Sequence, residues 1–232
     1  MREIKIIKLK FGLYKKQIVN ALTIILLLAT LILASAYTYS ENIQQGLAEN
    51  LIRLHVIANS NSQEDQEVKY MVRDEILKYM SSQTVDLKST DEARNLICNN
   101  ISRIEKIAKE TLEANGYSYE VKAYFGNFPF PTKVYDDVTL PAGEYQSLRI
   151  VLGKGSGANW WCVMFPPLCF VDASRGVVPD SSKAQMQNVL SEEEYNLAMS
   201  NSVGSTPQVK FKFKIVELLQ QSKMNLAKSQ GQ

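Results

Sequence analysis

The sequence predicts an α+β domain in which an N-terminal strand, two amphipathic helices and an antiparallel sheet meander follow one another. Three observations carry this prediction. Residues 51–58 form a short run rich in branched side chains, apolar residues recur at helical spacing between residues 62 and 116, and strict alternation begins at residue 117. Two amphipathic helices must bury their apolar faces against a partner, and the alternating segments supply a sheet. We expect this domain to occupy residues 51–172.

Residues 1–36 have the composition of a signal peptide or a signal anchor. Six basic residues and one acid stand within residues 1–16, and an almost unbroken apolar run extends from Ile18 to Ala34. A helix of this run spans roughly 26 Å, close to the hydrocarbon thickness of a bilayer, so length alone does not separate the two interpretations. Small residues at 34–36 favour cleavage after Ala36. In both cases the basic flank leaves the bulk of the chain outside the cytosol.

The charge of the remaining chain argues against nucleic-acid binding. Removing the six bases and one acid of residues 1–36 from the chain's 26 bases and 24 acids leaves 20 and 23, so the formal net charge changes from +2 to −3. A mildly acidic chain lacks the basic footprint that phosphate contacts require. The basic isoelectric point therefore reflects the leader.

The first elements of the domain follow a polar spacer at residues 37–50. The strand of residues 51–58 is interrupted only by Arg53 and His55. Ser62, with Asp65 three residues later, forms a capping box that opens the first helix. The second helix begins near Ser89 and ends at residues 115 and 116, where Asn and Gly favour a left-handed stop.

The sheet is expected from four further segments, which are residues 117–125, 132–135, 145–152 and 160–165. The glycines of residues 153–157 match no phosphate-binding loop and predict a hairpin connection. Residues 173–232 are polar and predict a C-terminal extension with little core. Within it, lysines alternate with apolar residues from Val209 to Leu219, which suggests an edge strand or an amphipathic arm.

Histidine and cysteine offer few routes to catalysis. His55 is the only histidine, and a structural or interface role is favoured over a base paired with a cysteine such as Cys162. No metal-ligand spacing is present, so neither a metal nor a cofactor is expected. Cys98 lies on the apolar side of the second helix and is expected in the core of the domain. Cys162 and Cys169 either form a disulfide or pack as free thiols.

Aromatic residues crowd into about forty positions and include two pairs that could meet a partner. Phe128 and Phe130 alternate with prolines, which cannot donate ladder hydrogen bonds, and Trp160 and Trp161 are adjacent. Exposed aromatics with prolines mark binding surfaces, whereas buried ones fill cores. The sequence leaves both interpretations open.

Four blocks of the chain resemble the stage II sporulation protein R family. They are the stretch Leu51–Arg73, beginning Leu-Ile-Arg-Leu-His-Val-Ile-Ala-Asn-Ser-Asn-Ser, residues Gly126–Pro131, the Leu-Pro-Ala-Gly-Glu-Tyr of residues 140–145, and Gly157–Phe170, which includes Trp-Trp-Cys-Val-Met-Phe-Pro-Pro-Leu-Cys-Phe. Met164 stands where the family commonly has Leu. The resemblance covers most of residues 51–172.

The resemblance implies an exported signal of endospore-forming bacteria rather than an enzyme. Such proteins are made in the forespore and pass through the export machinery into the space between the two membranes. The implied partner is a membrane-embedded aspartic protease of the mother cell, which then processes a sigma factor precursor. This chain lacks the D-[ST]-G signature of such proteases.

The expected contact residues are Arg53, His55, Phe128, Phe130, Trp160 and Trp161. An envelope hydrolase that uses Cys162 and His55 is the alternative.

Overall fold

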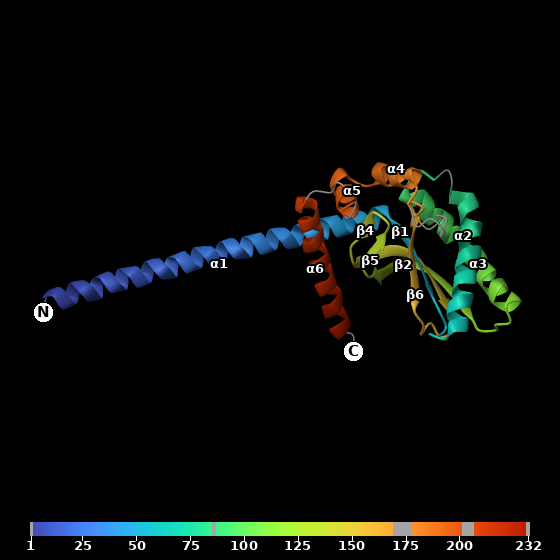
Figure 1. The fold of residues 1–232 in the computed structure, drawn as a ribbon, viewed down its shortest axis with the longest axis horizontal. Helices are drawn as coiled ribbons and strands as arrows, with labels where there is room; N and C mark the ends of the chain where they lie inside the picture. Colours follow the sequence, from blue (N-terminus) through green and yellow to red (C-terminus); the bar gives the residue numbers. More distant parts are fainter. Residues whose placement is uncertain (1, 85–86, 169–177, 201–206, 231–232) are drawn as a thin grey trace.

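The computed structural model describes residues 2–84, 87–168, 178–200 and 207–230. A four-stranded sheet lies at the centre of the domain, and a long N-terminal helix projects from it (Figure 1). One face of the sheet is covered by two helices, α2 (Gln63–Thr84) and α3 (Thr90–Ala114). The α+β class is confirmed.

The N-terminal helix α1 runs without a break from Arg2 to Asn50. It contains a window apolar enough to cross a membrane, and none of that window is buried in the protein, which fits a signal peptide or an anchor. The expected spacer at residues 37–50 is the last part of this helix. There Ile43 and Leu47 are buried against the domain, because apolar residues four positions apart share one helix face.

The sheet is mixed rather than a simple antiparallel meander. Its strands are β1 (Ile52–Ile57), β2 (Val121–Phe130), β5 (Gly143–Leu152) and β6 (Asn159–Phe165), in the order β2-β5-β1-β6. The first strand β1 pairs in parallel with β5 and antiparallel with β6. Residues 153–157 therefore do not form the expected hairpin, since they pass over the end of β1 to connect strands on its two sides.

Ser62 and Ser89 cap the first two helices of the domain as predicted, but the capping box at Ser62 is incomplete because the Ser62 amide donates to the Ser60 hydroxyl and not to Asp65. The Ser62 hydroxyl accepts a hydrogen bond from the Asp65 amide, and the Ser89 side chain accepts from the Glu92 amide. The apolar stripes of α2 and α3 pack against the face of the sheet that these helices cover. They form one cluster with it that includes Val72, Ile76, Ile104, Leu112, Leu54 and Ile150. Cys98, expected in this core, is instead exposed, because its position turns it away from the stripe.

The segment with alternating prolines is a strand and not a loop. Phe128, Pro129 and Phe130 pair with residues 143–145 of β5 as the end of β2. Pro129 is tolerated there because β2 is the edge strand of the sheet, where one side of the backbone needs no ladder partner.

A small hairpin and three C-terminal helices build a second core on the other side of the sheet. The hairpin consists of β3 (Lys133–Tyr135) and β4 (Val138–Leu140), joined by Asp136 and Asp137 with Asp136 in the left-handed region. The helices are α4 (Asp180–Val189), α5 (Glu192–Ala198) and α6 (Pro207–Gln230). Together with the end of α1 they enclose a cluster that includes Val138, Leu140, Tyr145, Met186, Leu197, Phe213 and Val216.

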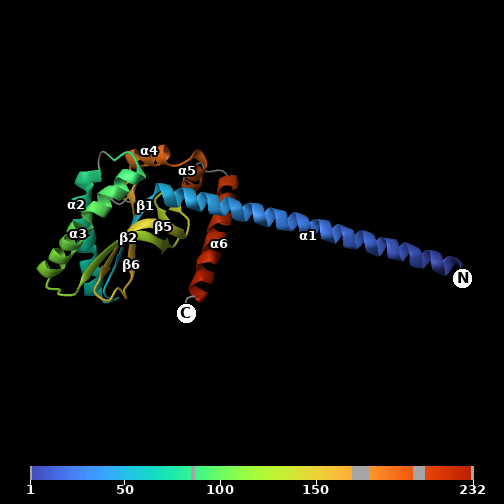
Figure 2. The same cartoon turned by 180° about the vertical axis from the view of Figure 1, so that it is seen from behind.

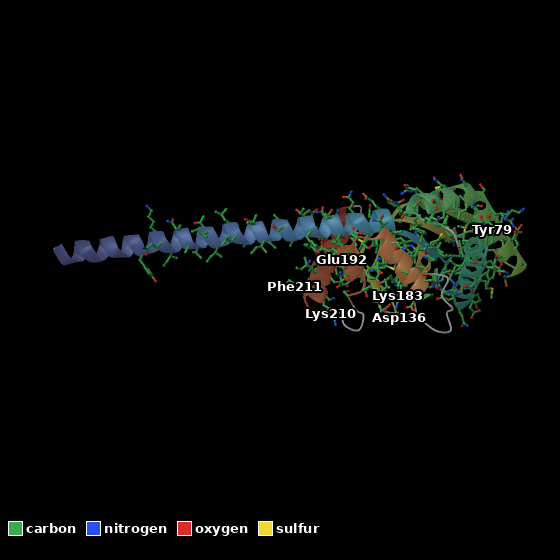
Figure 3. The ribbon with its side chains drawn as sticks, turned by 90° about the horizontal axis from the view of Figure 1, so that it is seen from above. Tyr79, Asp136, Lys183, Glu192, Lys210 and Phe211 are labelled. Atoms are coloured by element: carbon green, nitrogen blue, oxygen red, sulfur yellow. The ribbon has the colours of Figure 1, made fainter. Side chains whose placement is uncertain are left out.

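The prediction of a polar C-terminal extension is corrected by this second core. The apolar residues of α4–α6 are sparse, but each helix places its few on one face, which is enough to cover a surface that the sheet already provides. An ion pair of 2.7 Å between Lys183 of α4 and Asp137 ties the helices to the hairpin, and Lys183 lies beside Asp136 in Figure 3. Of the two interpretations for residues 209–219, the edge strand is wrong, because these residues are helical.

Candidate functional site

The arginine and the histidine of β1 point away from the helix-covered face of the sheet. Side chains alternate along a strand, so Leu54 and Val56 enter the core with α2 and α3, while Arg53 and His55 face the opposite side. Arg53 is fully buried and His55 is 4% exposed. The strand thus carries one permanent charge and one titratable ring into the interior.

Arg53 is held by aromatic rings rather than by carboxylates. Its guanidinium carbon lies 4.2 Å from the ring centroid of Phe130 and 4.8 Å from that of Tyr145. Its Nη2 donates a 2.8 Å hydrogen bond to the Tyr135 hydroxyl, while Nε and Nη1 have no partner in the described ranges. Among the described residues no Asp or Glu forms an ion pair with it, so the local field is positive.

His55 lies inside a cage of three aromatic rings. It stacks on Trp161 with 5.0 Å between ring centroids and 16° between planes, and it lies 5.5 Å from Phe128 and 5.1 Å from Phe130. Burial, followed by the charges of Arg149 and Arg53, lowers the pKa of His55 to about 3. The imidazole is therefore neutral, and within the described part of the chain neither ring nitrogen has a hydrogen-bond partner.

Arg149 completes the arrangement, and the sequence interpretation missed it. It stands opposite His55 in the β1–β5 pairing, with its guanidinium carbon 5.0 Å from the ring centroid of Phe128. Its Nε is buried and has no partner among the residues that the structure describes, although the side chain as a whole is partly exposed. The sequence did contain a signal for Arg149. It lies in the alternating segment 145–152 on the same face as Tyr145 and Ser147, which are both buried, so a charged side chain at this position is unusual.

Part of this side of the sheet remains accessible. Phe128, Trp161 and Arg149 are partly exposed, and Tyr124, opposite Arg149 in the β2–β5 pairing, is 46% exposed. We call these four residues the open sheet face. Arg53, His55 and Phe130 lie beneath or beside it and support it, so of the six expected contact residues only Phe128 and Trp161 reach its surface.

The two adjacent tryptophans lie on opposite faces of the sheet. Trp160 pairs with Val56, packs against the core on the α2 side and has the guanidinium carbon of Arg73 4.8 Å from its ring. Trp161 pairs with His55 on the other side. Because neighbouring residues in a strand alternate, the pair cannot form one contact surface, and Trp160 is separate from the open sheet face.

The pair of Cys162 and His55 that a hydrolase would need is not formed. Cys162 pairs with Leu54 and so points to the α2 side, opposite to His55. Cys162 is buried and disulfide-bonded. Its predicted partner Cys169 lies outside the described residues, so that pairing stays a prediction. Within the described ranges no three His, Cys, Asp or Glu side chains converge as a metal site requires.

The Asn- and Ser-rich segment after β1 is held in place by side-chain hydrogen bonds and has a structural role. The Asp65 carboxylate accepts hydrogen bonds from Asn59 at 2.8 Å, Ser60 at 2.5 Å and the Tyr119 hydroxyl at 2.9 Å. Burial raises the pKa of Asp65, but these hydrogen bonds outweigh burial and lower it overall. Asn59 also accepts from the Lys154 amide, so this segment fixes the β5–β6 connection against the end of β1.

Comparison with known proteins agrees with the blocks described above. The family model for stage II sporulation protein R matches residues 48–175. A curated relative, stage II sporulation protein R of Bacillus subtilis (strain 168), is 39% identical over 186 residues, which are 76% of this chain and 83% of the relative. No solved structure matches.

Proposed function

This chain belongs to the stage II sporulation protein R family and so has a role in sporulation, and from that premise we propose that it is an exported signal. The signal activates a membrane-embedded aspartic protease of the mother cell, which then processes the precursor of a sigma factor. The forespore makes the protein and exports it to the space between the two membranes.

The N-terminal helix supports the export step. Its apolar segment is exposed along its length and follows a basic flank, and the folded domain begins only at its end. That order favours a domain on the far side of the membrane from the basic residues. The proposal holds both for a cleaved and for a tethered protein.

The single observation that carries the signalling proposal is the open sheet face. It combines partly exposed aromatic side chains with a buried Arg53 and a partly exposed Arg149, and each arginine has a buried guanidinium nitrogen without a partner among the described residues. Aromatic and arginine side chains are the residues that dominate binding at interfaces. An acidic side chain of the protease would pair with the partly exposed guanidinium of Arg149.

Activation then follows from preferential binding. A ligand shifts an equilibrium only by the difference between its affinities for the two states, so the open sheet face must fit the active state of the protease better than the inactive state. No chemical step by this chain is required.

The two tryptophans provide the test, because they stand side by side in the sequence and on opposite faces of the sheet. We expect Trp161→Ala to abolish processing of the sigma factor precursor in sporulating cells that depend on this chain. Trp160→Ala is the matched control and should retain processing. Immunoblots of the precursor and of each exported variant provide the readout. Normal processing with Trp161→Ala would contradict the proposed contact face.

A further inference from the structure

The last helix carries an apolar stripe that is exposed on its outer face. Phe211, Leu218 and Leu226 lie on one face of α6 and are 68%, 65% and 63% exposed. Their spacing of seven and eight residues returns to the same side of a helix. The opposite face holds the buried Phe213, Val216 and Gln220. The helix is therefore apolar on both its inner and its outer face.

Hydrogen bonds fix where α6 crosses α1. The Gln220 amide donates to the Ser40 hydroxyl at 3.2 Å and to Glu41 at 2.9 Å, and Lys223 forms a 2.7 Å ion pair with Glu41. Ser40 stands six residues after Ala34, where the apolar run of α1 ends. At about 1.5 Å per residue, the crossing lies about 9 Å beyond that end.

That distance corresponds to the interfacial layer of a bilayer. The polar layers add roughly 5–8 Å on each side of the hydrocarbon core, and a helix has a radius of about 5 Å. The near side of α6 would therefore reach the headgroups if the apolar run of α1 spans the core. Tyr37, 50% exposed between the run and the crossing, is of the residue type enriched at this depth.

The outer face of α6 is turned toward the projecting part of α1. Figures 1 and 2 show α6 running across α1, on the side of the domain nearest the N-terminal half of that helix. In Figure 3 the labelled Phe211 lies at this edge of the domain, while Lys183 and Asp136 lie farther from it. A helix that runs across a spanning helix, and not alongside it, extends along the membrane surface.

The charge of α6 is opposite to that of the rest of the exported domain. Residues 207–230 contain five lysines and one acid, whereas residues 37–232 as a whole carry a net charge of −3. Lys210 and Lys214 are exposed beside the apolar stripe. A cationic face with an aromatic and leucines is the composition of helices that lie in the interface of anionic bilayers.

We propose that α6 lies on the outer surface of the membrane that α1 enters, with Phe211, Leu218 and Leu226 in the headgroup layer of a bilayer that contains anionic lipid. Lys210 and Lys214, beside the stripe, contact the lipid phosphates. The crossing at Ser40 and Glu41 then holds the domain against the membrane at a fixed height, and this contact persists after cleavage at Ala36 because the crossing lies beyond it.

The test measures the depth of the stripe in the full-length protein. The protein is reconstituted in vesicles of phosphatidylcholine and phosphatidylglycerol in a Cys98→Ser background, with a fluorophore on Leu218→Cys. The matched control carries the same fluorophore on Lys109→Cys, an exposed position of α3. Lipids with brominated acyl chains should quench most of the fluorescence at position 218 and little at position 109.

Two outcomes would overturn the proposal. One is equal quenching by the brominated lipid at positions 218 and 109. The other is a label at 218 that is shielded from aqueous iodide but unaffected by brominated lipid, which would mean that a second copy or another protein covers the stripe. Phe211→Glu with Leu218→Glu should leave the far-ultraviolet circular dichroism unchanged and should release a label at position 226 from lipid quenching.

Discussion

Two cationic side chains define the candidate site at the scale of single residues. Arg53 is buried among the rings of Phe130, Tyr135 and Tyr145, and Arg149 stands over Phe128 at the border with solvent. A buried guanidinium without a carboxylate is costly unless rings and hydroxyls replace part of its solvation. Such an arrangement leaves positive potential available for a partner at Arg149.

The protonation of His55 gives the first prediction. Its folded pKa of about 3 lies below the ordinary value of 6.5, so the folded state binds fewer protons than the unfolded state. The free energy of unfolding should be unaffected by His55 above pH 6.5 and should decrease as the pH falls toward 3, by up to about 1.4 kcal/mol per unit. His55 is the only histidine, so NMR of the protein with labelled histidine gives one imidazole signal. That signal should not shift between pH 8 and 5, and a midpoint near 6.5 would contradict the buried cage.

Neutralising one arginine on each side of the sheet gives the second prediction. Arg149→Gln removes the free cationic donor of the open sheet face, whereas Arg73→Gln removes the corresponding arginine over Trp160. Loss of a charged hydrogen bond to the partner costs about 1.5–3 kcal/mol, so Arg149→Gln should weaken the response roughly tenfold or more. Arg73→Gln should respond as wild type. A titration of exported protein against precursor processing measures both, and equal responses from the two variants would refute the assignment of faces.

Periodicity determined how well each element could be predicted. The strand of residues 51–58, both capped helices and the strand of residues 160–165 follow from local pattern alone. The pairing of strands does not, because the parallel contact between β1 and β5 joins residues about ninety positions apart. For the same reason the sequence could name Arg53, His55, Phe128, Phe130 and Trp161 as candidate contact residues but could not show that they lie together. It gave no reason to add Arg149, which strand pairing brings beside His55.

The C-terminal helices show where a local pattern misleads. Alternating Lys and Phe residues at positions 210–213 have the period of a strand, and the surrounding composition is polar. The helix instead packs its apolar side in the second core, where Gln220 donates a hydrogen bond to Ser40 of α1, 180 residues away in the chain. Tertiary packing therefore decides the structure of this segment.

Phe211 and Phe213 give the third prediction, at the scale of the element. In a strand these two side chains would share one face, but in α6 Phe211 is 68% exposed and Phe213 is 5% exposed. Phe213→Ala should lower the free energy of unfolding by about 3–5 kcal/mol, because it leaves a cavity in the second core. Phe211→Ala should change it by less than about 0.5 kcal/mol. Denaturant unfolding of the two variants in detergent compares them, and similar losses would argue against the helix.

At the scale of the whole molecule, one continuous helix links the membrane segment to the folded domain. Leu47 of α1 is fully buried in the second core, so the domain begins within the helix and is not suspended on a flexible spacer. Mass spectrometry of the exported protein should show a chain that begins at residue 37 if the signal is cleaved, with Leu47 retained. An N-terminus beyond Leu47 would contradict the domain boundary given by the structure.

The central claim is that the open sheet face of this exported protein contacts a membrane-embedded aspartic protease. Site-specific photocrosslinking in sporulating cells tests it most directly, with a benzophenone amino acid in place of Phe128. The control carries the same group in place of Tyr70, which is 40% exposed on α2 on the other side of the sheet. We predict an adduct with the protease from position 128 and none from position 70. An adduct from position 70 alone, or no adduct from position 128 of a variant that still signals, would contradict the account.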